Sequence, residues 1–401
     1  MFLGCGDTAV KKRNPDKKRY KIGWLKHNKN YHPTWMTLLI KDIFTYWGMT
    51  IIQINDDLDL LEEMIADAKD QPALYHPGPY WRNKSDNALS EIKRCGIQDF
   101  RGSSNYIGQS YSDNVSIDIR DGFNFGLEKI LRWVTKVYPL RIVYDAQVNL
   151  TKSYAGESLV YLQEILHDKP RVRELLKKYK VPYSILGGCL RTVKIDGNDY
   201  SIHYLNLLDQ HDHIATRIQF DNIRTVFEIG GGFGTNIHLL IENYPNIKKV
   251  IYLDIPPNLY VATQYLKAFY GKSVYDYQKH KKVERISFSD TDDLEIYCIA
   301  PWQIEKLNVS IDIFINSHSF VEMPERVVSN YVNYIMKLLD SNKSVIALTT
   351  YDNFDLNTTM NPARMPIFFQ GRKFVFFKTD SLLDRSRKNL HFISLSSCLG
   401  K

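Results

Sequence analysis

Hydrophobic and polar positions follow a regular pattern in the second half of the chain. From Thr225 onward, short runs rich in Val, Ile, Tyr and Phe alternate with longer segments of helical period, which is typical of an α/β sheet. These runs predict strands at residues 225–229, 249–254, 294–299, 310–316, 344–350, 373–379 and 391–397. The intervening segments predict helices at residues 234–243, 256–270, 301–308 and 324–340. We therefore expect a Rossmann-like, seven-stranded, doubly wound sheet, with an antiparallel last strand because no clear helix separates the last two runs.

The first 200 residues lack this alternation and are expected to be mainly helical. Helical spacing of apolar residues predicts helices at residues 33–47, 58–69, 84–95, 122–137, 156–167 and 170–179, and polar loops separate them. The sequence predicts a basic tail at residues 1–20, a helical lid domain at 21–200 and the α/β domain at 201–401.

Composition and charge narrow the possible classes of protein. Hydrophobic residues make up 44% and charged residues 24%, as in globular proteins, and the net charge is +7. This mild excess would attract an anionic substrate, but it is too weak to indicate nucleic acid. No apolar run approaches the length of a membrane span, so we expect no transmembrane segment. The five scattered cysteines predict reduced thiols in the cytoplasm and no metal site. The oligomeric state is open, a homodimer being one option.

A glycine-rich turn follows the first predicted strand. Residues 228–236 read EIGGGFGTN, with Glu228 two positions before the first of the alternating glycines Gly230, Gly232 and Gly234. Glycines between a strand and a helix allow a sharp turn and a close approach of the backbone to a ligand. A dinucleotide-binding G-x-G-x-x-G loop would need glycine where Thr235 stands. The pattern E-x-G-x-G-x-G is instead the arrangement of S-adenosylmethionine enzymes.

More candidate ligand residues follow the next strands. Asp254 ends the second strand, where a carboxylate suits the ribose hydroxyls. Trp302 could stack on adenine and Gln303 could bond its edge, although a proline-initiated helix with a core tryptophan explains them equally well. The predicted cofactor-binding residues are Glu228, Gly230, Gly231, Gly232, Asp254, Ile255, Trp302, Gln303 and Asn316. A nicotinamide cofactor and a turn that only packs helix on sheet are the alternatives.

The fourth predicted strand ends in a polar cluster that suits catalysis. His318 has an intrinsic pKa near neutrality and is the candidate base, while Glu322 could orient it or act as the base itself. Ser319 and Glu322 also read as a helix capping box. Pro324 would then lie inside that helix, so we expect the helix to begin at Pro324 and residues 316–323 to form a loop. The alternative is a turn with no chemical role.

Candidate acceptor-binding residues come from this cluster and from the long loop at residues 96–114. Loops of that length often bind ligands, although ordinary surface polarity explains the loop residues equally well. The predicted acceptor-binding residues are Arg101, Tyr106, Tyr111, Ser317 and Ser319.

From about Ile185 to Thr350 the chain resembles a family of sugar O-methyltransferases within the class I S-adenosylmethionine-dependent methyltransferases. The resemblance rests on residues 228–271, 300–307 and 314–335, above all on the string DIPPNL that begins at Asp254. It implies S-adenosylmethionine as cofactor and methyl transfer to a sugar hydroxyl in bacterial surface polysaccharide biosynthesis, as for capsule or O-antigen. The acceptor would be nucleotide-, lipid- or polymer-linked. The rival functions are an NAD-dependent oxidoreductase and a non-catalytic, methyltransferase-like glycan-binding subunit.

Overall fold

The computed structural model describes residues 54–97, 100–101, 170–181, 186–187, 189, 192–352, 359–382 and 388–394. They all belong to the larger of two compact units, which spans Ile54–Lys401, while the other spans Met1–Gln53. The predicted basic tail, the helices predicted at residues 33–47, 122–137 and 156–167, and the candidate residues Tyr106 and Tyr111 lie outside the described residues.

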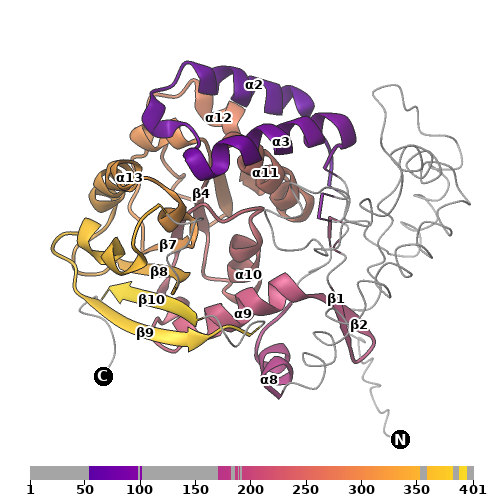
Figure 1. Ribbon diagram of the computed structural model, residues 1–401, viewed down its shortest axis with the longest axis vertical. Helices are drawn as coiled ribbons and strands as arrows, with labels where there is room; N and C mark the ends of the chain where they lie inside the picture. The colour runs from indigo at the N-terminus through magenta and orange to yellow at the C-terminus, as the bar shows by residue number, and fades with distance from the viewer. Residues whose placement is uncertain are drawn as a thin grey trace, which may run out of the picture. The chain divides into compact units, whose positions relative to one another are not determined.

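A mixed sheet of eight strands organises the larger unit (Figure 1). The strands run in the order β5-β6-β4-β3-β7-β8-β10-β9. Their bounds are β3 Thr225–Ile229, β4 Lys249–Leu253, β5 Val274–Tyr275, β6 Glu295–Ile299, β7 Ile313–Ser317, β8 Val345–Tyr351, β9 Phe374–Asp380 and β10 Lys388–Ser394. Strand β10 is antiparallel to both of its neighbours, β8 and β9, and the pairs from β5 to β8 are parallel. The predicted α/β class and antiparallel last strand are confirmed.

The predicted number of strands was one too low. The extra strand, β5, has only two residues, and it pairs at the sheet edge through Val274 with Ile296 and through Tyr275 with Tyr297. Two residues are too few to produce a visible alternation of apolar and polar positions, so the sequence pattern did not reveal it.

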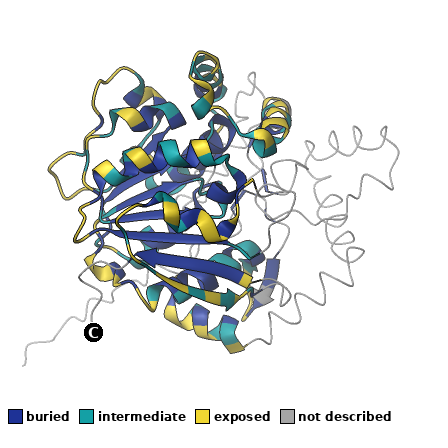
Figure 2. Cartoon of the chain, turned by 60° about the vertical axis from the view of Figure 1, so that its left-hand side comes forward, coloured by how far each residue is buried: buried dark blue, intermediate teal, exposed yellow. Residues whose placement is uncertain are grey.

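Helices connect the parallel strands, and the pattern predicted all of these connections except the short helix α12. The connections are α10 Thr235–Asn243, α11 Pro256–Tyr270, α12 Tyr277–Lys281, the 3-10 helix η5 Pro301–Lys306 and α13 Glu325–Leu338. Figure 2 shows their exposed outer faces in yellow against dark blue strands. Strands β4 and β6 are buried along their whole length, as expected for parallel strands covered on both faces.

The segment around Pro324 differs in part from the prediction. Helix α13 begins at Glu325 with Pro324 as its N-cap, and the Pro324 carbonyl accepts a hydrogen bond from Val327 N at 2.8 Å. Ser319 and Glu322 therefore form no capping box, in agreement with the prediction. The expected loop, however, contains a 3-10 turn, η6, at Ser319–Glu322. The turn forms because Asn316 Oδ1 accepts a hydrogen bond from Phe320 N at 3.1 Å.

Two early helices, α2 (Leu58–Lys69) and α3 (Pro79–Cys95), belong to the same unit as the sheet. Figure 1 shows them beside α11 and α12. Tyr277 Oη of α12 donates a hydrogen bond to Asp67 at 2.6 Å, and Lys281 pairs with Glu63 and Asp67 at 2.8 and 2.7 Å. Most of the predicted lid domain at residues 21–200 lies outside the described residues, so that domain boundary stays a prediction.

A two-stranded hairpin and two helices precede the eight-stranded sheet in the chain. Strands β1 (Thr192–Ile195) and β2 (Asn198–Ser201) form an antiparallel hairpin, and α9 (Ile202–Ala215) follows it. Helix α8 (Pro170–Lys178) packs on α9 through Arg171, which pairs with Asp209 and with Asp212 at 2.7 Å each. No helix among the described residues has the length and apolar character needed to cross a membrane.

Candidate cofactor and acceptor site

The polar candidates gather where the parallel strands end. Glu228 is the penultimate residue of β3, Asp254 directly follows β4, and Ser317 ends β7. These strands are parallel and adjacent in the order β4-β3-β7, so their carboxyl ends lie at one edge of the sheet. In open α/β sheets this edge is where ligands bind.

Glu228 is a buried acid with one oxygen lacking a partner. Its side chain is 1% exposed, and Oε1 accepts a hydrogen bond from Asn236 Nδ2 at 2.8 Å. Oε2 is buried and has no hydrogen-bond partner. Burial raises the pKa of Glu228 to about 8, and the nearby Asp254 carboxyl group adds to the rise. Leaving a buried polar atom unpaired is costly, so this oxygen fits a donor group from a ligand.

Two glycines of the loop, Gly230 and Gly231, lie so close to their neighbours that a side chain would not fit at either position. A Cβ at Gly230 would lie 2.2 Å from Ser319 Oγ, and the φ of Gly230 is +72°. A Cβ at Gly231 would lie 2.4 Å from Glu228 Oε2. The loop therefore needs glycine at both positions, because Ser319 at the start of η6 and the buried Glu228 lie directly against it.

Asp254 is held by a tyrosine that sequence reasoning missed. Its carboxyl group accepts a hydrogen bond from Ile255 N at 2.8 Å and from Tyr252 Oη at 3.0 Å. Tyr252 Oη also lies 2.5 Å from the carbonyl oxygen of Gly232, so it links the end of β4 to the glycine loop. Burial raises the pKa of Asp254 to about 7, against the lowering effect of these bonds. Tyr252 is two residues before Asp254 on the same strand face, which is the sequence signal that could have revealed it.

Trp302 and Gln303 lie in η5, directly after β6. Gln303 is 1% exposed and its Oε1 accepts a hydrogen bond from Ala300 N at 2.9 Å, whereas Nε2 has no partner. The Trp302 ring packs edge-on against Tyr277, with ring centroids 5.8 Å apart. The proline-initiated turn is thus present, with Pro301 at its first position. A role for Trp302 and Gln303 at adenine stays a prediction.

Asn316 and Ser319 join the ends of two strands. Asn316 Nδ2 donates hydrogen bonds to Ile229 O at 2.9 Å and to Ser319 Oγ at 2.6 Å, and Ser319 Oγ lies 3.2 Å from Ile229 O. These bonds fasten the end of β7 to the end of β3 and occupy polar groups of both side chains. Ser317 is half-buried at the end of β7. Ligand contacts of Asn316, Ser317 and Ser319 stay predictions.

His318 has a strained backbone and an unpaired ring nitrogen. Its φ is +67°, which is rare for a residue other than glycine and is commonly found at functional sites. Its N–H donates to Thr349 O at 2.8 Å, and its ring stacks on Tyr351 with centroids 4.2 Å apart. Nδ1 is buried without a hydrogen-bond partner. Burial, together with His203, lowers the pKa of His318 to about 4, so the ring is neutral at physiological pH.

Glu322 connects this edge of the sheet to helix α3. It is 7% exposed, and its Oε2 accepts a hydrogen bond from Trp81 Nε1 at 2.7 Å. Sequence reasoning did not single out Trp81, because no local pattern relates residues so far apart in the chain. The orientation of His318 by Glu322 stays a prediction.

Arg101 is completely buried near the glycine loop. It donates hydrogen bonds to Leu186 O at 3.0 Å and to Ser201 Oγ at 2.7 Å, and its guanidinium lies 4.9 Å from the ring of Phe233. These contacts stabilise the surroundings of the loop, and an acceptor contact stays a prediction. Among the described residues, no group of three or more His, Cys, Asp or Glu side chains is placed to hold a metal ion.

Comparisons with known proteins show limited likeness. No family model matches the chain, and no curated protein matches its sequence. The solved structures similar to it include the mitomycin 7-O-methyltransferase MmcR, at 11% identity and a TM-score of 0.35 over 59% of this chain and 60% of that one. Magnesium protoporphyrin IX methyltransferase from Synechocystis PCC 6803, with bound SAH, matches at 11% identity and a TM-score of 0.34 over 60% of this chain and 100% of that one.

Human N-acetylserotonin methyltransferase, in complex with SAM, matches at 12% identity and a TM-score of 0.31. That match covers 48% of this chain and 56% of the human one, so this chain spans less than two thirds of both the human and the mitomycin enzyme. Matches this weak identify no shared activity, and the functional argument rests on the residues of the site.

Proposed function

We propose that the chain is an S-adenosylmethionine-dependent O-methyltransferase that methylates a sugar hydroxyl, in bacterial surface polysaccharide biosynthesis. The observation that carries the proposal is the pair of buried acids, Glu228 and Asp254, with a glycine loop between them that leaves no room for a side chain at Gly230 or Gly231. The family resemblance of the sequence supplies the sugar acceptor and the biosynthetic role.

The donor set at this edge fits the proposed cofactor. The unpaired Oε2 of Glu228 suits an N–H donor with positive charge, as in the amino group of the methionine part. The Asp254 carboxyl group follows the second strand of the fold, the position that suits a ribose. The unpaired Nε2 of Gln303 suits an acceptor nitrogen of a base.

S-adenosylmethionine, when bound, supplies an electrophilic methyl group. The protein then has to hold the acceptor hydroxyl in line with that group and exclude water, and positioning of this kind accounts for much of the rate in such reactions. The resemblance and the place of His318 at the end of β7 favour it as the residue that faces the acceptor. Its neutral Nδ1 would take the hydroxyl proton as the new C–O bond forms.

Mass spectrometry of the host's surface polysaccharide tests the proposal. Removal of the protein is expected to cost the polysaccharide one methyl group on a defined sugar, and the intact chain is expected to restore it. The Glu228→Gln variant, introduced in place of the intact chain, is the control, because it lacks the ionisable acid at the proposed cofactor position. An unchanged methylation pattern after removal of the protein would contradict the proposed role.

A further inference from the structure

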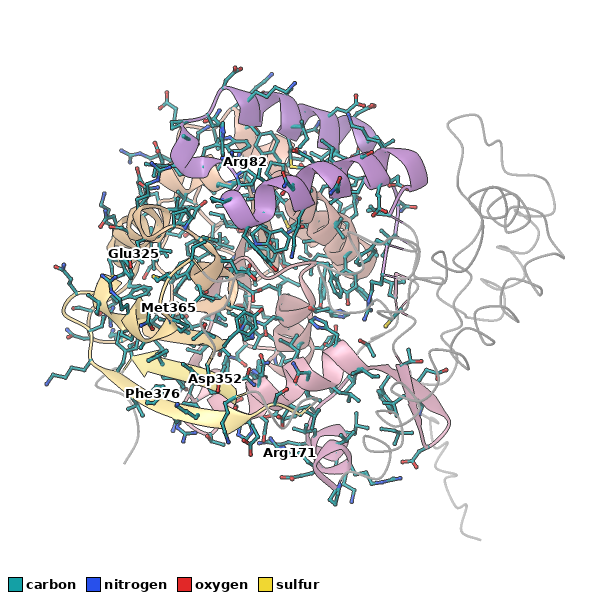
Figure 3. The ribbon with its side chains drawn as sticks, in the orientation of Figure 1. Arg82, Arg171, Glu325, Asp352, Met365 and Phe376 are labelled. Atoms are coloured by element: carbon teal, nitrogen blue, oxygen red, sulfur yellow. The ribbon has the colours of Figure 1, made fainter. Side chains whose placement is uncertain are left out.

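Tyr351 is the last residue of β8, and its side chain lies against the proposed base. The Tyr351 ring stacks on the ring of His318, with centroids 4.2 Å apart and an angle of 20° between the two ring planes. Figure 3 labels Asp352, which directly follows Tyr351 in the chain. The contact adds to the site a residue that the sequence patterns did not single out.

Paired strands on both sides fix the position of Tyr351. Strand β8 lies between β7 and β10 in the sheet, and Tyr351 is in register with Asn389 of β10. On the other side, Ser317 of β7 is in register with Thr349, whose carbonyl oxygen accepts the hydrogen bond from His318 N at 2.8 Å. A side chain on a paired strand is held more precisely than one on a loop, so Tyr351 offers His318 a rigid surface.

The ring of His318 forms no hydrogen bond with the residues that the structure describes. Nδ1 is buried without a partner, and the ring instead contacts Tyr351 by stacking. A general base needs such an arrangement, because the nitrogen that takes the proton has to stay unoccupied while the ring keeps its orientation. The stack fixes the plane of the His318 ring and uses neither of its nitrogens.

A second stacked pair in the same sheet provides a contrast. Phe377 of β9 stacks on His391 of β10, with centroids 4.7 Å apart and an angle of 17° between the planes. Both nitrogens of His391 are occupied, since Nδ1 lies 3.0 Å from Thr349 Oγ1 and Nε2 lies 2.9 Å from Thr379 Oγ1. Hydrogen bonds therefore orient the ring of His391, whereas the ring of His318 depends on its stack.

We propose that Tyr351 is a positioning residue, which holds the ring of His318 in the plane from which it takes the proton of the acceptor hydroxyl. This inference rests on the proposed function for the identity of the reaction, but the contact between the two rings does not. Stacked rings are a favourable arrangement, and the stack restrains rotation of the His318 ring about its side-chain bonds. Without the Tyr351 ring, His318 would sample several orientations, and few of them would face the acceptor.

The protonation of His318 reports on the same contact. Burial lowers the pKa of His318 to about 4, and His203 of α9 adds to the lowering. His391 of β10 is a further titratable group near this ring, and its own pKa is lowered in part by His318. Removal of the Tyr351 ring would open one face of His318 to water and would raise its pKa toward the ordinary value of 6.5.

Nuclear magnetic resonance of the full chain, with labelled histidines, tests the contact without turnover. The His318 signals, assigned with His318→Ala, are expected to be shifted by the Tyr351 ring and to titrate near pH 4. Tyr351→Leu is expected to remove this shift and raise the pKa of His318, whereas Tyr351→Phe keeps a stacked ring and is expected to retain both properties. Phe377→Leu is the matched control, because it removes the ring stacked on His391, and it is expected to leave the titration of His318 as it was.

Labelled methyl transfer to surface polysaccharide from cells that lack the protein gives the second readout. At saturating S-adenosylmethionine, Tyr351→Leu is expected to lower kcat about tenfold and to leave the KM for the polysaccharide unchanged, because the orientation of the base acts on the chemical step. Tyr351→Phe is expected to restore kcat. Thermal unfolding checks that the variants fold, and if Tyr351→Leu does not, the ring-induced shift of the His318 signals in the original protein decides.

The outcomes distinguish this inference from the proposed function. An unchanged pKa of His318 or an unchanged kcat in Tyr351→Leu overturns the positioning role, and so does a Tyr351→Phe variant that behaves like Tyr351→Leu. If the pKa of His318 rises in Tyr351→Leu but the original protein neither binds S-adenosylhomocysteine nor transfers a methyl group, Tyr351 still positions His318 and the proposed function fails.

Discussion

At the scale of single residues, the site keeps polar groups in states that are costly without a ligand. Glu228 holds a carboxyl group with a raised pKa and an unpaired oxygen, and His318 combines a strained backbone with an unpaired ring nitrogen. Features of this kind lower stability and persist where binding or catalysis needs them.

Replacement of Glu228 by Gln is expected to stabilise the free protein at alkaline pH. The pKa of Glu228 is about 8 in the folded state against its usual 4.5, so the unfolded chain loses this proton first as pH rises. The contribution of Glu228 to the free energy of unfolding is therefore complete below pH 4.5 and is lost as the pH rises to 8. One pKa unit corresponds to about 1.4 kcal/mol, so urea unfolding is expected to give a gain above about 1 kcal/mol at pH 8. The gain should vanish near pH 4.5, and an equal effect at both pH values would contradict the raised pKa.

Gly230→Ala is expected to damage the cofactor site more than backbone strain alone would. The new Cβ would meet Ser319 Oγ at 2.2 Å, and overpacking of this kind costs about 1–3 kcal/mol. Gly197→Ala is the matched control, because Gly197 has a similar φ of +83° and nothing within 4 Å of its Cβ position. Only Gly230→Ala should lose affinity for S-adenosylhomocysteine in calorimetry. Equal losses of stability in the two variants would mean that the contact with Ser319 is not tight.

At saturating S-adenosylmethionine, where titration of Glu228 and Asp254 no longer limits cofactor binding, the rate of methyl transfer is expected to stay constant from pH 8 down to pH 6 if His318 is the base. Burial lowers its pKa to about 4, so the neutral form that accepts a proton persists through this range and is lost only as pH falls toward 4. Labelled methyl transfer measures the profile. His318→Ala should abolish turnover while affinity for S-adenosylhomocysteine persists, and an inflection near pH 6.5 would contradict the buried environment of the ring.

At the scale of elements, local sequence patterns predicted the structural features that depend only on residues near each other in the chain. The seven long strands, the glycine turn and the start of α13 after Pro324 all follow from short-range periodicity and proline chemistry. The strand β5 was too short to detect. The contacts of Tyr252 with Gly232 and of Trp81 with Glu322 arise only when distant segments meet, so no local pattern could predict them.

Trp81 and Glu322 are expected to be coupled energetically. Trp81→Phe keeps most of the apolar contact but removes the N–H donor, and leaving Glu322 without it should cost about 1–2 kcal/mol. A double-mutant cycle with Glu322→Ala, in which urea unfolding gives the stability of each variant, separates the energy of this hydrogen bond from the loss of packing. Strictly additive effects would show that the bond contributes nothing to holding α3 at the site.

At the scale of the whole molecule, one compact unit unites the sheet with the helices that reach its ligand edge. Strands β3 and β4 supply the two acids, β7 leads into the segment with His318 and Glu322, and Trp81 of α3 bonds to Glu322 in that segment. Cofactor and acceptor would thus meet at one edge of the sheet, with the acceptor beside the segment that follows β7.

Calorimetry with S-adenosylhomocysteine and with NADH tests the central claim most directly. The buried acids and the glycine loop predict that the chain binds S-adenosylhomocysteine at one site and does not bind NADH. Asp254→Asn should weaken this binding about tenfold, the effect of one charge-assisted hydrogen bond. Binding of NADH in place of S-adenosylhomocysteine would contradict the account and favour an oxidoreductase.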